Sequence, residues 1–469
     1  MVKRRASAII VLVLGLSAGV VVLLPSAHAT ATVTTKRYGG ADRYGTAMVL
    51  AEQAFPQGAN AAILARAEDF PDGALGFADA LSGNYLAGYF DAPILLTEED
   101  SVPAETLQAL ATLKTKDVIV MGGSAAVSDA VLQQLSATPS AAGGDLVAAR
   151  LGGVDRYQTA AIAAEAIGAA AVGTINGLPT AIIARGDQFP DALAGGPLAF
   201  AGHFPLILTE PDSLDPNAMT ALQTLGIKAA LILGGTAAIS DTTQAAIEAL
   251  GITTERLSGP DRQATAAEVA NYAITYLGFK DTLVDLSRGD DYPDALAGGP
   301  EAAKGGPVPI VLTVSPTALG PDTANWLMSV NGTMGEIDAL GLQAAVSDPV
   351  LALAAQDATC TEPISTTLPV TLPFTLPVSV PLTLPVTLPV TTPTLPGQCN
   401  APVTTTTLAG ASTTSATGTT LPGGVTLPTL PITLPTLPVT LPTVPTLPVT
   451  LPVTVPCLTT LPLLGSICP

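Results

Sequence analysis

The sequence is poor in the residues that usually build metal sites and nucleophilic catalytic sites. It holds two histidines and four cysteines among 469 residues. His28 lies in an N-terminal segment discussed below, His203 has no repeated counterpart, and the first cysteine is Cys360. Neither a zinc cluster nor a Cys–His pair can therefore be built from the first 359 residues. We predict a protein with no metal, no cofactor and no catalytic residue.

Basic residues are scarce as well. Lys and Arg total 18 against 38 Asp and Glu, which gives a formal net charge of −20. A field of this sign disfavours nucleic acid and anionic lipid as general partners. An anionic ligand would need a local basic pocket, so the positions of the few arginines are informative.

Charged side chains are absent from the C-terminal part of the chain. Residues 363–469 contain no Asp, Glu, Lys or Arg but 22 of the 42 prolines, in repeats of Thr-Leu-Pro-Val. Proline fixes φ and removes backbone donors, so neither helices nor central strands form there. We predict a disordered Pro/Thr-rich tail over 359–469 with a polyproline II bias, which suits a spacer and O-glycosylation. Its Leu and Val content also allows a tail that mediates association.

The four cysteines belong to this tail. In an exported protein disulfides can form. Pairing of nearest neighbours, Cys360 with Cys399 and Cys457 with Cys468, is the simplest of three connectivities. Mass mapping without reduction distinguishes this arrangement from a Cys399–Cys457 link or from free thiols.

Residues 1–29 have the pattern of a secretory signal peptide. Basic residues at 3–5 precede an apolar run over 8–24, and Ala27-His28-Ala29 fits a cleavage site. An uncleaved anchor is the alternative, but the run is short for a span of ~20 residues and Pro25 interrupts it. We expect a mature chain that begins at Thr30 and is secreted.

The rest of the chain carries one set of motifs three times. A signature of the form Arg-x-x-Gly-x-Asp-Arg begins at Arg37, Arg150 and Arg256. A second signature, Arg-x-x-x-(Phe/Tyr)-Pro-Asp, begins at Arg66, Arg185 and Arg288. A third, an apolar run, ends at Thr97, Thr209 and Thr313. A Gly-Gly pair follows at 122–123 and 234–235, and the third copy keeps only Gly341.

In the second and third copies the last residue of the second signature also begins an Asp-Ala-Leu triplet, at Asp191 and Asp294. In the first copy, seven extra residues separate two candidates for the same position. Asp72 keeps the spacing from Arg66, whereas Asp79 keeps the Asp-Ala-Leu context. We favour Asp79 as the equivalent, with Asp72 as the alternative.

Each copy alternates fully apolar runs with amphipathic segments. In the first copy, 61–65, 93–96 and 118–121 have the length of strands, and 103–113 and 128–135 that of helices. Fully apolar strands that alternate with helices indicate a parallel sheet covered on both faces. We predict three tandem three-layer α/β units with right-handed crossovers, at 30–145, 146–252 and 253–358.

Repeated arginines and aspartates are the candidate binding residues. The second-signature arginines should end strands, and ligands of open α/β sheets bind beyond the carboxyl ends of strands. The guanidinium fork matches phosphate or carboxylate. The candidates are Arg66, Arg185, Arg288, Arg43, Arg156, Arg262, Asp79, Asp191 and Asp294.

Structural roles for the same residues stay open. Each arginine has acids close in sequence, so ion pairs within a unit also explain the pattern. The three aspartates also fit helix N-caps. The Gly-Gly pairs fit a tight turn as well as a phosphate cradle.

Together these motifs resemble the type 2 cell-wall-binding repeat of Gram-positive surface proteins, over roughly residues 36–350. The resemblance implies three Rossmann- or Toprim-like units packed as a pseudo-trimer. It also implies a protein of the cell wall or cell surface, a non-covalent anchor that holds anionic wall polysaccharide or a peptidoglycan-linked polymer. In that family such modules often accompany an effector, and no effector domain is visible here. We therefore expect a binding protein rather than an enzyme. The alternative is a wall-modifying enzyme or the targeting subunit of an autolysin, an amidase or a peptidase.

Overall fold

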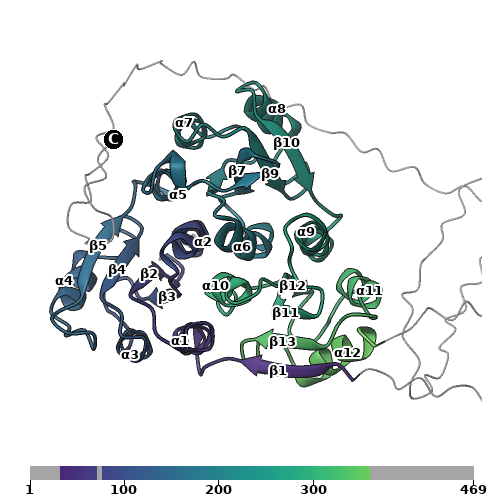
Figure 1. The fold of residues 1–469 in the computed structure, drawn as a ribbon, viewed down its shortest axis with the longest axis horizontal. Helices are drawn as coiled ribbons and strands as arrows, with labels where there is room; N and C mark the ends of the chain where they lie inside the picture. Colours follow the sequence, from purple (N-terminus) through teal and green to yellow (C-terminus); the bar gives the residue numbers. More distant parts are fainter. Residues whose placement is uncertain (1–31, 71–75, 360–469) are drawn as a thin grey trace, which may run out of the picture.

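The computed structural model describes residues 32–70 and 76–359. The predicted signal peptide, Asp72 and the four cysteines of the tail lie outside the described residues. Figure 1 shows three α/β units arranged around a common centre. Among the helices of the described part, none is long and apolar enough to cross a membrane.

The three repeats follow the same order of strands and helices. The first contains β1 (Thr34–Tyr38), α1 (Arg43–Ala54), β2 (Ala61–Arg66), α2 (Ala78–Phe90), β3 (Ile94–Thr97), α3 (Ala104–Thr112), β4 (Asp117–Met121) and α4 (Asp129–Ser136). The second contains β5 (Val147–Leu151), α5 (Arg156–Glu165), η1 (Ala169–Ala171), β6 (Thr174–Ile175), β7 (Leu178–Arg185), α6 (Pro190–Gly202), β8 (Leu206–Thr209), α7 (Pro216–Thr224), β9 (Ala229–Leu233) and α8 (Asp241–Glu248). The third contains β10 (Thr253–Leu257), α9 (Arg262–Tyr276), β11 (Leu283–Arg288), α10 (Gly298–Ala303), β12 (Ile310–Thr313), α11 (Pro321–Ser329), β13 (Glu336–Leu340) and α12 (Asp348–Asp357).

Each sheet borrows one strand from the next repeat. The strand orders are β3-β2-β4-β5, β8-β7-β9-β10 and β12-β11-β13-β1, with parallel pairing throughout and the short β6 added antiparallel to β7. In the third sheet, Thr34 of β1 lies opposite Glu336 of β13. The first strand of the chain therefore completes the last sheet, and the ring closes. These borrowed strands were not predicted from the sequence.

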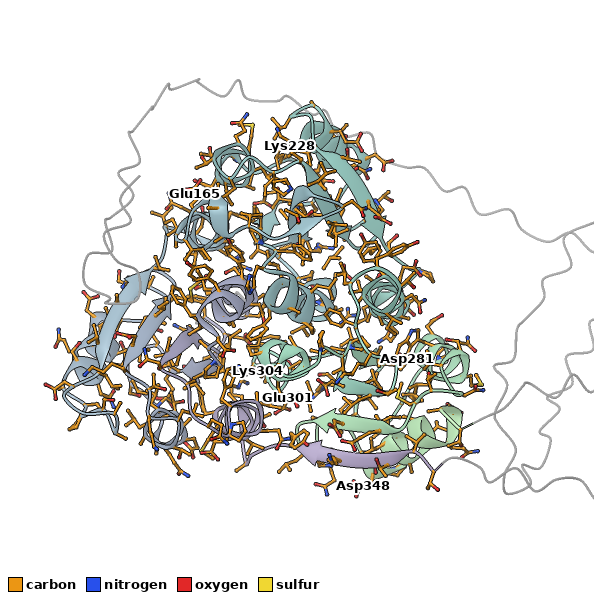
Figure 2. The ribbon with its side chains drawn as sticks, in the orientation of Figure 1. Glu165, Lys228, Asp281, Glu301, Lys304 and Asp348 are labelled. Atoms are coloured by element: carbon orange, nitrogen blue, oxygen red, sulfur yellow. The ribbon has the colours of Figure 1, made fainter. Side chains whose placement is uncertain are left out.

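The α/β fold with parallel sheets and three repeated units is as predicted. The helices α2, α6 and α10 gather at the centre of the molecule, and α3, α4, α7, α8, α11 and α12 lie toward the outside (Figure 1). The central strand of the first unit, β2, is buried over its whole length, which explains its continuous apolar run. Side chains fill the space between the sheets and the central helices (Figure 2).

The Asp of the first signature starts the first helix of each repeat. Asp42 caps α1 by accepting a hydrogen bond of 2.8 Å from the Gly45 amide. Asp155 and Asp261 cap α5 and α9 in the same way. The invariant spacing of this signature thus has a local structural cause, the satisfaction of an amide at a helix N-terminus.

Removal of residues 34–38 should destabilise the third unit selectively. Without β1, β13 becomes an unprotected sheet edge, whereas β4 and β9 keep their partners β5 and β10. In a chain that starts at Gly39 we expect faster hydrogen exchange in β13 and α12 and a lower melting temperature. Unchanged exchange in β13, or an equal loss of protection in all three sheets, would contradict the role of β1 as the closing strand.

Candidate functional site

The second-signature arginines lie at the carboxyl ends of strands, as expected from sequence. Arg66, Arg185 and Arg288 are the last residues of β2, β7 and β11. Each lies in register with the buried threonine that ends the neighbouring strand, Thr97, Thr209 or Thr313. The same edge of each sheet therefore presents an arginine and a threonine, at the place where open α/β sheets bind ligands.

These three arginines are also held by ion pairs within their own unit. Arg66 is only 3% exposed, and its Nη1 donates to Glu99 Oε2 at 2.7 Å while its guanidinium lies 4.3 Å from the ring centroid of Phe70. Arg185 donates hydrogen bonds to both carboxylate oxygens of Asp187, at 2.6 and 2.7 Å. Such a paired fork positions a loop firmly and leaves fewer N–H groups for a ligand.

Arg288 repeats this arrangement in the third unit. Its Nε and Nη2 donate to the two oxygens of Asp290 at 2.8 and 3.0 Å, and Asp291 lies 3.6 Å from Nη1. The ion pairs that sequence reasoning had left open as an alternative are thus present in all three units.

The first-signature arginines are placed differently. Arg43, Arg156 and Arg262 are the first residues of α1, α5 and α9. Each donates Nη1 to the backbone carbonyl directly after a strand-end arginine, at Ala67, Gly186 and Gly289, with a distance of 2.7 Å for Arg156. In the described part of the chain no carboxylate forms a salt bridge with these three arginines.

The three aspartates face three glycines at the ends of strands. A Cβ atom at Gly122 would come within 2.4 Å of Asp79 Oδ2, and one at Gly234 within 2.4 Å of Asp191 Oδ2. At Gly341 the corresponding distance to Asp294 Oδ2 is 2.6 Å. The equivalence with Asp191 and Asp294 supports Asp79 as the residue of the first copy.

These glycines have a conformational reason to recur in every copy. Gly122, Gly234 and Gly341 have φ values of 100°, 98° and 92°, which side-chain-bearing residues rarely adopt. The turn after the strand and the close approach of the aspartate both require glycine, so the third copy keeps this position although its second glycine is lost.

The aspartates are not helix N-caps. Phe77 and Phe189 are the cap residues of α2 and α6, so Asp79 and Asp191 lie inside the first turn, and Asp294 precedes α10. A carboxylate in the first turn still gains from the helix dipole, but it makes no capping hydrogen bond to the helix amides.

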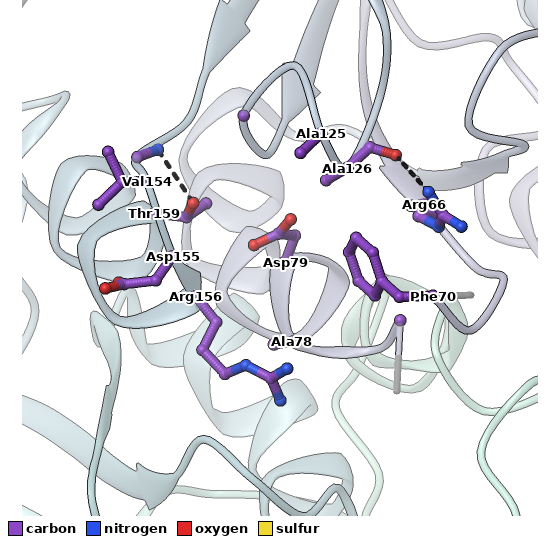
Figure 3. A pocket seen from close by; sticks show the side chains of 13 residues that line it. Arg66, Phe70, Ala78, Asp79, Ala125, Ala126, Val154, Asp155, Arg156 and Thr159 are labelled. Carbon is purple, nitrogen blue, oxygen red and sulfur yellow. Dashed lines mark hydrogen bonds between the residues drawn. The ribbon is translucent and has the colours of Figure 1, made fainter. Parts of the chain in front are cut away.

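The aspartate of one repeat meets the first-signature arginine of the next repeat. Asp79, Arg66 and Arg156 line one cavity of about 250 Å³ between the first two repeats, together with Thr159 and Phe70 (Figure 3). Thr159 also accepts a hydrogen bond of 3.0 Å from the Gly153 amide, which ties the signature loop to the cavity wall.

The other two aspartates stand in the same surroundings. Asp191 interacts electrostatically with Arg185 and Arg262. Asp294 interacts with Arg288 and Arg43 and accepts a hydrogen bond of 2.7 Å from Thr46 of the first repeat. The nine candidate residues therefore form three composite groups of one aspartate and two arginines, and the third group closes onto the first repeat.

Burial governs the charge of these aspartates. It raises the pKa of Asp79 to about 6, although Arg156 and the Thr159 hydroxyl favour the carboxylate. Burial likewise raises the pKa of Asp191 and of Asp294, against the opposing influence of their arginines. Each group thus combines two fixed positive charges with one carboxyl group that takes up a proton at a higher pH than an ordinary aspartate does.

An aromatic cluster lies beneath the three groups, and sequence reasoning did not identify it. Phe77, Phe189 and Tyr292 are each two residues before the aspartate, and their ring centroids are 5.2–5.9 Å apart. Arg156 lies 5.8 Å from the ring of Phe77, and Arg262 lies 5.7 Å from that of Phe189. An aromatic residue two positions before each aspartate is the sequence signal that could have identified this cluster.

Replacement of Gly122 tests the contact with Asp79. The control is Gly143, which has φ of 103° and would bring a Cβ atom within 4 Å of no neighbouring heavy atom. Both Gly122→Ala and Gly143→Ala force the same unfavourable φ, at about 1–2 kcal/mol, but only the first also pushes against Asp79 and the Cβ atom of Ala126. We expect Gly122→Ala to lower the free energy of unfolding by about 1–3 kcal/mol more, measured by urea denaturation. Equal losses would show that Asp79 does not hold the position described here.

Comparison with known proteins identifies the repeats. The family Cell wall binding domain 2 (CWB2) matches residues 37–132, 150–244 and 256–351. The N-acetylmuramoyl-L-alanine amidase LytC of Bacillus subtilis (strain 168) is 32% identical over 286 residues, which are 61% of this chain and 51% of that protein. The amidase enhancer of the same organism is 28% identical over 270 residues, 58% of this chain and 33% of that protein.

Solved structures show the same fold. Cwp6 from Clostridium difficile superposes with a TM-score of 0.58 at 24% identity, over 70% of this chain and 48% of that one. Cwp8 from the same organism gives a TM-score of 0.57 at 24% identity, over 70% and 52%. The chain spans about half the length, or less, of the curated relatives named above. With its three matched repeats, the chain belongs to the cell wall binding domain 2 family.

Proposed function

We propose that this protein is a non-covalent anchor that holds an anionic polymer of the cell wall through its three repeats. Its repeats are cell-wall-binding domains. The observation that carries the finer proposal is the threefold recurrence of two arginines around one aspartate, in an otherwise acidic protein. A polymer with regularly spaced phosphate or carboxylate groups fits such a repeated arrangement.

The two arginine sets have different roles in this proposal. Arg66 is buried and its donors are occupied, so it and its equivalents position the loop at the sheet edge. Arg156 lines the cavity, and its Nη1 donates to the Gly186 carbonyl. The other N–H groups of its guanidinium are left for the ligand. The cavity of about 250 Å³ suits one charged group and its neighbouring sugar atoms rather than a long oligosaccharide.

Three such groups on one rigid ring favour multivalent binding. Once one group holds the polymer, the next binding step is intramolecular and proceeds at a high effective concentration. Weak individual contacts then sum to firm attachment without a covalent link. Salt should weaken this attachment, because exposed charge–charge contacts are screened.

Export is part of the same proposal. The segment 1–29 would direct the chain across the membrane, and the wall would then retain it. N-terminal sequencing of protein recovered from walls should begin at Thr30, and an intact N-terminus would contradict cleavage.

The arginine proposal is tested by two matched triple variants. Arg43→Ala, Arg156→Ala and Arg262→Ala together should reduce co-sedimentation with isolated Bacillus subtilis walls by at least about tenfold, because each group loses a charge-assisted contact. The control changes Arg37, Arg150 and Arg256 to Ala. These also donate to the carbonyls of Gly341, Gly122 and Gly234, but Arg150 does not line the cavity.

Melting temperatures separate a binding role from a structural one. If both triple variants lose similar stability and only the first loses wall binding, the proposal holds. Equal losses of binding would assign all six arginines to structure. Binding that persists on walls stripped of phosphate-containing polymers would exclude those polymers as the ligand.

Protonation of the aspartates should strengthen binding. The pKa of Asp79 is raised to about 6, so between pH 7.5 and pH 5 the group loses a negative charge that opposes an anionic ligand. We expect wall affinity to rise about threefold to tenfold over this range. The variant with Asp79, Asp191 and Asp294 all changed to Asn should bind as tightly at pH 7.5 as at pH 5. Identical pH slopes for the two proteins would contradict this role.

The raised pKa of Asp79 also determines how the stability of the fold changes with pH. A carboxyl group whose folded-state pKa lies above its ordinary value of 3.8 stabilises the fold when protonated. The free energy of unfolding should therefore fall as pH rises from about 4 through about 6, and less so in the Asn variant. Thermal melts at these pH values measure the difference.

An enzymatic role is the competing proposal. One relative is an amidase and another an amidase enhancer, and the segment they share with this chain includes the wall-binding repeats. Zymography on peptidoglycan with the purified chain distinguishes the two proposals. A lytic band that survives in the arginine variants would replace anchoring with catalysis.

A further inference from the structure

Three acidic side chains meet in the interior of the third unit. Asp285 comes from β11, Glu301 from α10 and Asp338 from β13, and one carboxylate oxygen of each lies within 4.8 Å of the others. Asp285 is 0% exposed and Asp338 is 3% exposed, while Glu301 is partly buried. Figure 2 shows Glu301 on the central helix α10, near α1.

The other two repeats have apolar residues at all three positions. Asp285 stands three residues before the strand-end arginine, where the first and second repeats have Ile63 and Ile182. Glu301 stands seven residues after the aspartate of the Asp-Ala-Leu triplet, in place of Leu86 and Leu198.

Asp338 stands three residues before the glycine of positive φ, in place of Ile119 and Leu231. All six apolar counterparts are buried in the hydrophobic core. Three separate elements have thus exchanged a core hydrophobe for an acid at one common point in space. A concerted exchange of this kind requires a compensating partner, because lone buried carboxylates strongly disfavour folding.

Within the described residues no cationic side chain forms a salt bridge with any of the three acids. Both carboxylate oxygens of Asp285 and one oxygen each of Glu301 and Asp338 have no hydrogen-bond donor there. The hydroxyl of Ser287, two residues along the same face of β11 and 0% exposed, also lacks a partner within the described part of the chain.

Lys36 favours the charged forms of Glu301 and Asp338 but forms a salt bridge with neither. Lys36 of β1 lies opposite Asp338 in the sheet, but it is half exposed and its Nζ pairs with Glu336 Oε1 at 2.5 Å. Burial raises the pKa of Tyr38, which lies on the same strand. The negative charges of Asp338 and Glu301 raise it further. Among the described residues these three carboxyl groups therefore have no salt-bridge partner where β1 closes the ring, and burial raises the pKa of each.

We propose that Asp285, Glu301 and Asp338 bind a divalent metal cation that is specific to the third repeat. A site built only from oxygen ligands selects a hard cation such as Ca²⁺ or Mg²⁺ rather than zinc or copper. The ion would join β11, β13 and α10 and so strengthen the unit that the N-terminal strand completes. This site is separate from the three arginine–aspartate groups and does not depend on wall binding.

The test uses the full chain after treatment with a chelator. Equilibrium dialysis against Ca²⁺, Mg²⁺ or Mn²⁺, followed by elemental analysis, should find about one tightly held ion per chain. The same cation should raise the melting temperature. No stoichiometric ion with any of the three cations would overturn the proposal, as would a melting temperature that is independent of all of them. In either case shared protons would be what neutralises the cluster.

The decisive variant restores the residues of the second repeat. Asp285→Ile, Glu301→Leu and Asp338→Leu together should fold, lose the bound ion and melt at a temperature independent of cation. The control neutralises three exposed acids, Asp100, Asp145 and Asp212, to Asn and should keep the ion.

A single conservative change covers the case in which the triple variant does not fold. Asp338→Asn keeps the shape of the side chain and should weaken cation binding at least about tenfold, with an unchanged circular dichroism spectrum. Wild-type affinity in this variant, or loss of the ion in the surface control, would overturn the site.

Discussion

The pairing of each sheet with the first strand of the following repeat is the constraint on which the rest of the molecule depends. β5 completes the first sheet and β10 the second. The loop that follows each of these strands and carries the first signature therefore lies at the edge of the preceding unit. There it stands beside the aspartate and the strand-end arginine of that unit. The parallel pair of β1 and β13 applies the same rule across the whole chain and closes the ring. Without the borrowed strand a unit would have neither a complete sheet nor a complete arginine–aspartate group.

Close packing at the centre explains one difference between the three copies. The helices α2, α6 and α10 meet there, and equivalent positions are occupied by Asn84, Gly196 and Gly299. A Cβ atom at Gly299 would come within 1.9 Å of Asn84 Oδ1, and one at Gly196 within 3.3 Å of the same side chain. The space near the axis accepts one such side chain, so a perfect threefold repeat of asparagine would clash. Divergence of the copies is here a packing requirement.

Features that follow from local sequence patterns could be predicted from the sequence, whereas features that depend on contacts between distant segments could not. The apolar runs predicted β2, β3 and β4, and the motif order predicted the strand-end arginines, because both follow from residues close along the chain. The exchange of edge strands depends on pairing between distant segments, farthest apart for β1 and β13 at opposite ends of the repeats, and no local pattern encodes it. For the same reason the sequence did not show which aspartate would meet which arginine. The acidic cluster was readable only by comparing the copies position by position, since its members lie on three different elements.

The third repeat separates two kinds of constraint within one fold. It keeps Arg288, Asp294 and the glycine at 341, and so retains its arginine–aspartate group with Arg43 of the first repeat. In its interior, by contrast, it replaces three core hydrophobes with acids. Selection for stability alone would oppose these acids, and selection for the edge group alone would not require them. The sheet edge and the core of this unit are therefore under different constraints. The edge completes the ring of arginine–aspartate groups, and the core gains a cluster of acids in the one unit whose sheet is closed by β1.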